Sequence, residues 1–267
     1  MKRFALHSVP RSGSSWVGAV LNKHPEINYF FQPLFSNTFK PTLTEHSTHK
    51  EILKFFKELQ NTNDSFVQQL RFGEPNKSRN KHANRILYKE VRYHHIITNL
   101  LEKDPTIKII GLIRNPLATI NSWLEAPKEF RKDLCWNTLE EWQYASKKNE
   151  GKKEEFNGFY KWKETALLFE RLKTLHPENF HLVTYAELLA DTAHGFNGIL
   201  NHLSLDMHDK VLQFINETKN SSMNNKDAYS IHRIKSVDDT WKTQLNPIIV
   251  QSIQTELKDS ILEKYLL

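Results

Sequence analysis

A loop at residues 10–16 carries side chains suited to binding a phosphate or sulfate group. It reads Pro-Arg-Ser-Gly-Ser-Ser-Trp, and its polar and flexible residues are Arg11, Ser12, Gly13, Ser14 and Ser15. The arginine keeps its charge near neutral pH and the serines offer hydroxyl donors. The glycine lets the backbone approach an anion closely. The loop therefore indicates a cradle for a phosphorylated or sulfated ligand.

The elements around this loop support the same chemistry. The apolar run at residues 4–9 predicts a buried strand, and the serines before Trp16 predict the start of a helix. Backbone N–H groups and the positive end of a helix dipole then face the ligand. An ordinary serine-capped helix after a strand is the simpler alternative. A P-loop nucleotide triphosphatase fits poorly, because only one glycine is present and no lysine precedes the serines.

A second anion-binding element follows another apolar run, at residues 108–113. It is succeeded by Arg114 and, two residues later, by Pro116, which suits the first turn of a helix because the missing N–H costs nothing there. Ser122 would lie about two turns along that helix. Arg114 and Ser122 can thus face one phosphate, the arginine with two parallel hydrogen bonds.

Together these two elements resemble the sulfotransferases that use 3′-phosphoadenosine 5′-phosphosulfate (PAPS). The first loop matches the family's 5′-phosphosulfate loop, and Arg114 with Ser122 matches the spacing of its 3′-phosphate pair. An arginine in the loop, and the His24-Pro25 turn before a second strand that ends near Leu34, are most similar to the carbohydrate sulfotransferase branch. Weaker matches are Lys89-Glu90-Val91-Arg92 after residues 86–88, Tyr185-Ala186-Glu187-Leu188 after residues 181–184, and Trp241-Lys242.

The resemblance implies a set of donor-binding residues and PAPS as the co-substrate, with no metal. The set is Arg11, Ser12, Gly13, Ser14, Ser15, Trp16, Arg114, Ser122, Tyr185, Arg233 and Lys235. Trp16 and Tyr185 would lie near the adenine. Arg233 and Lys235 would close over the 3′-phosphate, although the family's basic-then-glycine pattern is not reproduced there. Solvated loop charges are an equal alternative for these two residues.

The expected chemistry needs groups that stabilise developing charge and a base that accepts a proton. The sequence departs from the family at the positions of the base. Arg11 and Lys89 are suited to stabilising the charge that develops on the leaving oxygen. The glutamate that several branches place after the second strand corresponds to Gln32. The histidine that the cytosolic branch places two residues after the strand lysine corresponds to Val91.

Three explanations for the missing base remain open. His94 is slightly favoured over Glu90 as a replacement, since a histidine titrates near neutral pH. Alternatively, His94 and His95 only begin a helix at residues 96–102. A third explanation is an acceptor that needs no strong base and is oriented by Gln32. Strand alternation places Lys89 and Glu90 on opposite faces of the sheet.

The segment pattern predicts an α/β fold, with a P-loop-like three-layer architecture, a central parallel sheet and inserted helices, in one domain over residues 1–267. The expected order is strand, helix, strand, variable region, strand, helix, strand, helix, then mostly helix. A helical stripe packs on the sheet through Phe159, Trp162, Ala166, Leu167, Phe169, Leu172 and Leu175. The acceptor is expected to meet residues 35–47, 71–84 and 125–142.

Some polar and aromatic residues have two interpretations. Trp136, Trp142 and Tyr144 could stack on a sugar or heterocycle, but they more often pack an inserted helix. His46 and His49 have the spacing of metal ligands without a third ligand in view, so no metal site is expected.

Composition restricts the class of protein. With 267 residues, 39% of them hydrophobic, the chain can bury one large α/β core. The net charge of +6 suits an anionic donor. The sequence has no basic tract with interleaved aromatic residues, so nucleic-acid binding is not expected. The single Cys135 excludes an internal disulfide. We expect a cytoplasmic location, because neither a signal peptide nor a transmembrane segment is recognised.

The expected activity is transfer of a sulfuryl group from PAPS to a hydroxyl or amine of a saccharide, lipid or small-metabolite acceptor. A catalytically silent nucleotide-binding module is an alternative, suggested by Gln32 and Val91. A P-loop-type kinase is a second alternative, opposed by the missing lysine. The sequence leaves the acceptor and the oligomeric state open.

Overall fold

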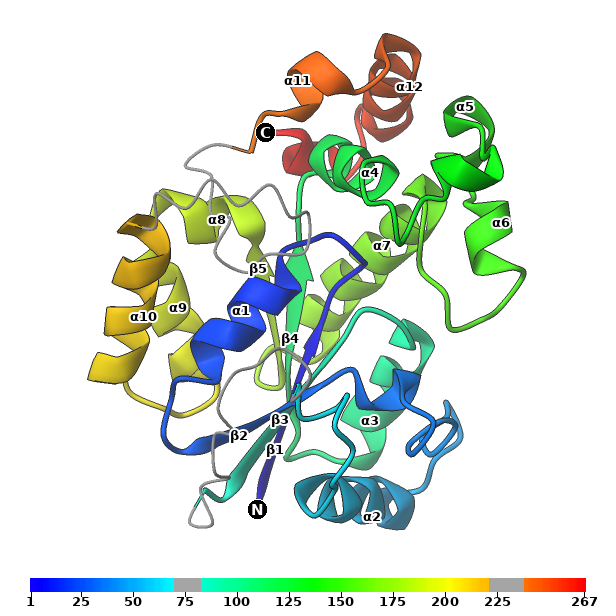
Figure 1. Ribbon diagram of the computed structural model, residues 1–267. Coiled ribbons are helices and arrows are strands. Elements are labelled where there is room, and N and C mark those ends of the chain that lie inside the picture. Colours follow the sequence, from blue (N-terminus) through cyan, green and yellow to red (C-terminus); the bar gives the residue numbers. More distant parts are fainter. Residues whose placement is uncertain (70–82, 221–237) are drawn as a thin grey trace.

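The fold is centred on one parallel sheet with helices on both faces (Figure 1). The computed structural model describes residues 1–69, 83–220 and 238–267. The strands are β1 (Lys2–His7), β2 (Ile27–Phe31), β3 (Arg85–Glu90), β4 (Lys108–Ile113) and β5 (Phe180–Thr184), in the spatial order β2-β3-β1-β4-β5. All four strand pairs are parallel. The predicted α/β architecture with a central parallel sheet is confirmed.

The register brings the carboxyl ends of the central strands to one edge. His7 at the end of β1 lies opposite Glu90 at the end of β3, and Phe31 at the end of β2 lies opposite Lys89. On the other side of β1, His7 lies opposite Gly111 of β4. The segments that follow these strands therefore meet in space, although they are far apart in the sequence.

One face of the sheet is covered by four helices. They are α1 (Ser14–Leu21), α8 (Tyr185–Ala190), α9 (Thr192–His202) and α10 (Asp209–Asn220). Strand residues with even numbers in β1, such as Phe4 and Leu6, point into this layer and are buried. Leu87 of β3 joins them, so the same face continues across the sheet.

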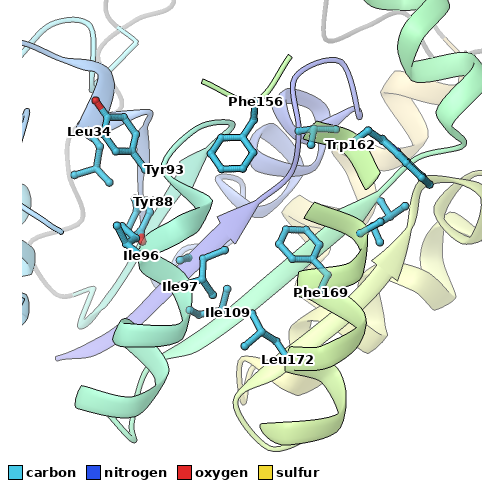
Figure 2. Packing of buried hydrophobic residues seen from close by; sticks show 14 of the residues in the cluster. Leu34, Tyr88, Tyr93, Ile96, Ile97, Ile109, Phe156, Trp162, Phe169 and Leu172 are labelled. Atoms are coloured by element: carbon cyan, nitrogen blue, oxygen red, sulfur yellow. The ribbon is translucent and has the colours of Figure 1, made fainter. Parts of the chain in front are cut away.

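The opposite face carries the larger core. Its helices are α2 (His49–Gln60), α3 (Ile97–Lys103), α4 (Pro116–Leu124), α7 (Phe159–Leu175) and α12 (Pro247–Leu257). Tyr88 of β3 and Ile109 of β4 pack here against Ile96, Ile97 and Phe169 (Figure 2). Shorter helices are η1 (Pro33–Phe35), η3 (His94–Ile96), η4 (Lys132–Leu134), α5 (Thr138–Glu141), α6 (Ser146–Asn149), α11 (Trp241–Gln244) and η5 (Glu263–Leu266).

One detail of the sequence prediction was wrong, and one strand had not been singled out. Residues 180–184 form β5 within a part that is otherwise mostly helical, as expected. This strand pairs with β4 at the edge of the described sheet, and of its five residues Phe180 and Val183 are buried. Its sequence therefore lacks the alternation of apolar and polar residues that would predict a strand. On α7, Leu167 and Leu175 are 44% and 59% exposed, because they lie off the buried stripe and at the helix end.

Within the described parts of the chain, none of the helices combines the length and the apolar character needed to cross a membrane. The assignment of residues 1–267 to a single domain stays a prediction.

Candidate functional site

The loop between β1 and α1 has the backbone of an anion cradle. Arg11 (φ 68°) and Gly13 (φ 88°) both adopt the left-handed conformation, which turns successive amides toward one side. The amide N–H groups of Gly13, Ser14 and Ser15 have no hydrogen-bond partner among the described residues. Ser12 Oγ is buried and also lacks a partner there. Unsatisfied donors of this kind fit a bound phosphate or sulfate group.

An aromatic wall closes one side of this loop. A Cβ atom added to Gly13 would lie 2.5 Å from Cε2 of Tyr185, which begins α8 directly after β5. The ring of Trp16 meets Tyr185 edge-on, with 5.9 Å between centroids, and packs against Phe196 behind it. Glycine is therefore needed at position 13 both for its φ angle and for the contact with the tyrosine ring.

The second anion-binding element lies beside the loop. Helix α4 begins at Pro116, as predicted, and Asn115 caps it by accepting hydrogen bonds from the first turn. Arg114 Nη1 donates a hydrogen bond to the carbonyl oxygen of Arg11 at 2.6 Å. Arg11 Nε donates to Ser122 Oγ at 3.2 Å. The structure thus joins Arg11, Arg114 and Ser122 in one network.

Arg114 also has a partner that the sequence did not indicate. Its Nε and Nη2 donate to the two carboxylate oxygens of Asp238 at 2.7 and 2.5 Å. The guanidinium carbon lies 5.2 Å from the centroid of the Tyr185 ring. Arg233 and Lys235, expected near the same position, lie outside the described residues.

Lys89 is the next-to-last residue of β3 and lies on the face of the sheet that α1 covers. It is 2% exposed, and its Nζ lies 4.5 Å from the centroid of the Phe31 ring. Burial lowers the pKa of Lys89 to about 7, a change opposed by Glu90 and reinforced by Arg92. Glu129 is a further carboxylate within electrostatic reach of the lysine. A bound anion would restore the charged form of this side chain.

Glu90 is completely buried on the other face of the sheet, as strand alternation predicts. Its Oε1 accepts a hydrogen bond from the Leu34 amide at 2.8 Å, and Oε2 has no partner among the described residues. Burial raises the pKa of Glu90 to about 8. A carboxyl group with a pKa near neutrality and a free oxygen has the properties of a general base.

The histidines after β3 have a different environment. His94 is completely buried, with Nδ1 3.1 Å from His7 Nδ1 and its ring 4.3 Å from that of Phe156. Burial lowers the pKa of His94 well below its usual value, and His7 lowers it further. Both His94 and His95 lie in η3, directly before α3. Burial thus lowers the pKa of His94 and raises that of Glu90, and the role of either residue as a base stays a prediction.

A polar group beyond Lys89 joins Gln32, which the sequence pattern had singled out, to Arg92 and Glu155, which sequence reasoning did not connect with it. The backbone N–H of Gln32 (φ 41°) donates to the backbone carbonyl of Lys89 at 2.8 Å. Arg92 Nη1 donates to Gln32 Oε1 at 3.5 Å, and Arg92 Nε is held by both carboxylate oxygens of Glu155 at 2.9 and 3.0 Å. The Arg92 guanidinium also lies 4.0 Å from the Phe35 ring centroid. The only sequence signal was that Arg92 follows Lys89 closely.

The variable segments divide between core and surface. Trp142 is buried against Phe159, whereas Tyr144 is 59% exposed and stacks on Tyr160. Trp136 is partly buried against the larger core. Residues 71–82 lie outside the described chain.

The two histidines with metal-like spacing, His46 and His49, lie at and just before the start of α2. His49 is the first residue of α2, and its Nδ1 lies 2.8 Å from the carbonyl oxygen of Lys103. Within residues 1–69, 83–220 and 238–267, no group of three or more potential metal ligands is found.

Solved structures share this fold at low sequence identity. The mouse sulfotransferase SULT7A1 complexed with PAP is 16% identical with a TM-score of 0.59, covering 99% of this chain and 87% of its own. A sulfotransferase domain from the curacin biosynthetic pathway is 19% identical with a TM-score of 0.53, covering 96% of both chains. A sulfotransferase domain from the Synechococcus PCC 7002 olefin synthase is 17% identical with a TM-score of 0.54, covering 97% and 94%.

No curated protein matches the sequence. The family model described as the sulfotransferase domain matches residues 2–262, nearly the whole chain, including both elements expected to bind an anion and the strand that carries Lys89. The chain belongs to the sulfotransferase domain family.

Proposed function

We propose that this sulfotransferase binds PAPS through the loop after β1 and transfers its sulfuryl group to a hydroxyl or amine. The observation that carries the proposal is a set of donors at Ser12–Ser15 that have no partner in the described part of the chain and are linked through Arg11 to Arg114 and Ser122. The loop would hold the 5′-phosphosulfate, and Arg114 with Ser122 would hold the 3′-phosphate. Trp16 and Tyr185 would border the adenine.

In the proposed reaction the bond from sulfur to the bridging oxygen of the donor breaks as the bond to the acceptor atom forms in line with it. Negative charge then collects on the bridging oxygen, which stays with the 5′-phosphate. Arg11 and Lys89 would stabilise this charge. The anionic donor raises the pKa of Lys89 above about 7, so the lysine is charged when the donor is bound.

Glu90 is the general base in this proposal. Its Oε2, which has no partner in residues 1–69, 83–220 and 238–267, would accept the acceptor proton, since the pKa of about 8 matches proton transfer near neutral pH. Gln32, fixed by Arg92, would orient the acceptor, and Phe35, which is 46% exposed, offers an apolar contact beside it. These features suit a small-molecule or saccharide acceptor. A cytoplasmic location and the absence of nucleic-acid partners stay predictions from the sequence.

Calorimetric titration with 3′-phosphoadenosine 5′-phosphate (PAP) tests the donor site. We expect PAP to bind, and Arg114→Ala to weaken PAP by about 100-fold because a bidentate charged contact is lost. Adenosine 5′-phosphate, which lacks the 3′-phosphate, should bind both proteins equally weakly. Arg131→Ala is the matched control, since Arg131 makes the same two-point contact with Asp133 on the surface. A preference for magnesium-ATP, or PAP binding that ignores Arg114, would contradict the proposal.

A catalytically silent PAP-binding module is favoured by one observation, the amide of Gln32 at the expected position of a carboxylate. It predicts the same titration but no transfer of labelled sulfate from PAPS to a panel of hydroxyl and amine acceptors. Transfer that is lost in Glu90→Gln would exclude the silent module.

A further inference from the structure

We propose that Asp238 is an internal anion that occupies the 3′-phosphate position on Arg114, so that the donor must displace it to bind. This inference rests on the proposed function, in which Arg114 is the ligand of the 3′-phosphate. It assigns to Asp238 a role in setting donor affinity and in selecting nucleotides that carry the 3′-phosphate.

The geometry of the contact is that of a bidentate oxyanion. Arg114 Nε and Nη2 meet the two carboxylate oxygens of Asp238 at 2.7 and 2.5 Å, on the edge of the guanidinium that takes a phosphate with two parallel bonds. The third donor, Nη1, is already used by the carbonyl of Arg11. A phosphate that binds this edge of Arg114 therefore competes for the same two N–H directions as the carboxylate.

The contact is also shielded more than an ordinary surface pair. The side chains of Arg114 and Asp238 are 15% and 18% exposed, and the Tyr185 ring lies beside the guanidinium. Partial burial reduces screening by water and salt. The comparable bidentate pair of Arg131 and Asp133 is 43% and 61% exposed, and its two residues are close in sequence.

The segment that supplies Asp238 is fastened to the same helix as the clamp. Asn121 Nδ2, on α4, donates to Gln244 Oε1 at 3.1 Å. Because the chain is anchored a few residues after Asp238, the carboxylate is held at high effective concentration beside Arg114.

This competition has a specific consequence for ligand choice. A ligand's apparent affinity falls by the fraction of protein in which its site is free. A nucleotide with a 3′-phosphate must displace Asp238, so its apparent affinity is reduced by this fraction. Once bound, its phosphate makes the contacts to Arg114 that Asp238 made before. A nucleotide without the 3′-phosphate leaves Asp238 in place, so its affinity does not depend on the aspartate.

The test compares Asp238→Asn with Asp239→Asn, which removes the neighbouring charge without touching Arg114. For Asp238→Asn we expect PAP to bind about tenfold more tightly by calorimetry, because the competing anion is lost. Adenosine 5′-phosphate should change by less than about twofold, as should both ligands in Asp239→Asn. In the Arg114→Ala background, Asp238→Asn should not increase the affinity for PAP.

Unchanged or weaker PAP binding by Asp238→Asn would overturn the inference and leave the donor site intact, provided that Arg114→Ala still weakens PAP. An equal increase in affinity for PAP and for adenosine 5′-phosphate would also overturn it, because the aspartate would then act by long-range repulsion of any anionic nucleotide. PAP binding that is insensitive to Arg114→Ala would instead overturn the proposed function. Asp238→Ser provides a second variant with the same expectations, and thermal unfolding checks that each protein is folded.

Discussion

The sheet edge has a proposed donor side and a proposed acceptor side, and the two are built in different ways. The donor side consists of two continuous stretches, residues 10–16 and 114–122, each a strand end, a turn and a helix start. The acceptor side is assembled from separate segments, with Lys89 in β3, Arg92 just after it, Gln32 after β2, and Glu155 far along the chain. Binding an anion needs local backbone geometry, whereas proton transfer needs groups whose surroundings come from the whole fold.

The two sides also differ in their electrostatics. On the donor side the groups without a partner among the described residues are backbone amides and the Ser12 hydroxyl, whose binding capacity does not depend on titration near pH 7. On the acceptor side, burial moves the pKa of Lys89 down to about 7 and that of Glu90 up to about 8. Substitutions that alter the backbone of the loop should therefore affect donor binding. Substitutions that remove a buried charge should affect turnover.

Removing the buried cation should give the largest effect and separate turnover from donor binding. We expect Lys89→Met to lower kcat by about 10³-fold, because the charge on the leaving oxygen loses its stabilising group. Lys108→Met is the control, since Lys108 begins β4 at the opposite edge of the sheet. Steady-state rates with labelled PAPS measure the effect, and a loss of PAP affinity as large as the loss of kcat would contradict this separation.

A backbone change should instead damage the donor side. Gly13→Ala is expected to lower the free energy of unfolding by about 3 kcal/mol, since alanine disfavours φ 88° and its Cβ meets the Tyr185 ring. PAP should bind at least about tenfold more weakly. Urea unfolding and calorimetry provide the measurements.

The matched variant is Gly151→Ala, which has a similar φ of 67° but no atom within 4 Å of the added Cβ. It should cost about 1 kcal/mol and leave PAP binding unchanged. Equal effects of the two substitutions would show that the tyrosine contact is unimportant.

The smallest effect concerns the pH dependence of stability on the acceptor side. The pKa of Glu90 is raised to about 8 from the ordinary 4.5, so between these pH values the folded state binds more protons than the unfolded state. Stability from this group therefore falls as pH rises from 5 to 7. Glu90→Gln should lack this fall.

Urea midpoints at pH 5, 6 and 7 make the comparison. His7 and His94, whose pKa values are lowered by burial, act in the opposite direction in both proteins, so the difference between wild type and variant is the quantity to examine. Parallel pH curves for the two proteins would count against a neutral, buried Glu90.

Sequence reasoning succeeded where the signal was local. The loop at residues 10–16, the proline at the start of α4 and the central parallel sheet were predicted from short patterns. It failed where the environment mattered, as with Leu167, whose apolar character does not reveal that it lies off the buried stripe. Sequence reasoning also could not place the ring of Phe156, more than sixty positions away, against His94.

The sequence by itself determined the family, the fold class and the composition of the donor loop, because turn geometry, helix capping and strand periodicity depend on neighbouring residues. Only the tertiary structure decided the partners of the charged groups. It paired Arg114 with Asp238, left one oxygen of Glu90 without a partner among the described residues, and buried Lys89 over Phe31. These contacts join residues that are distant along the chain, and burial and charge pairing act through space and not along the sequence.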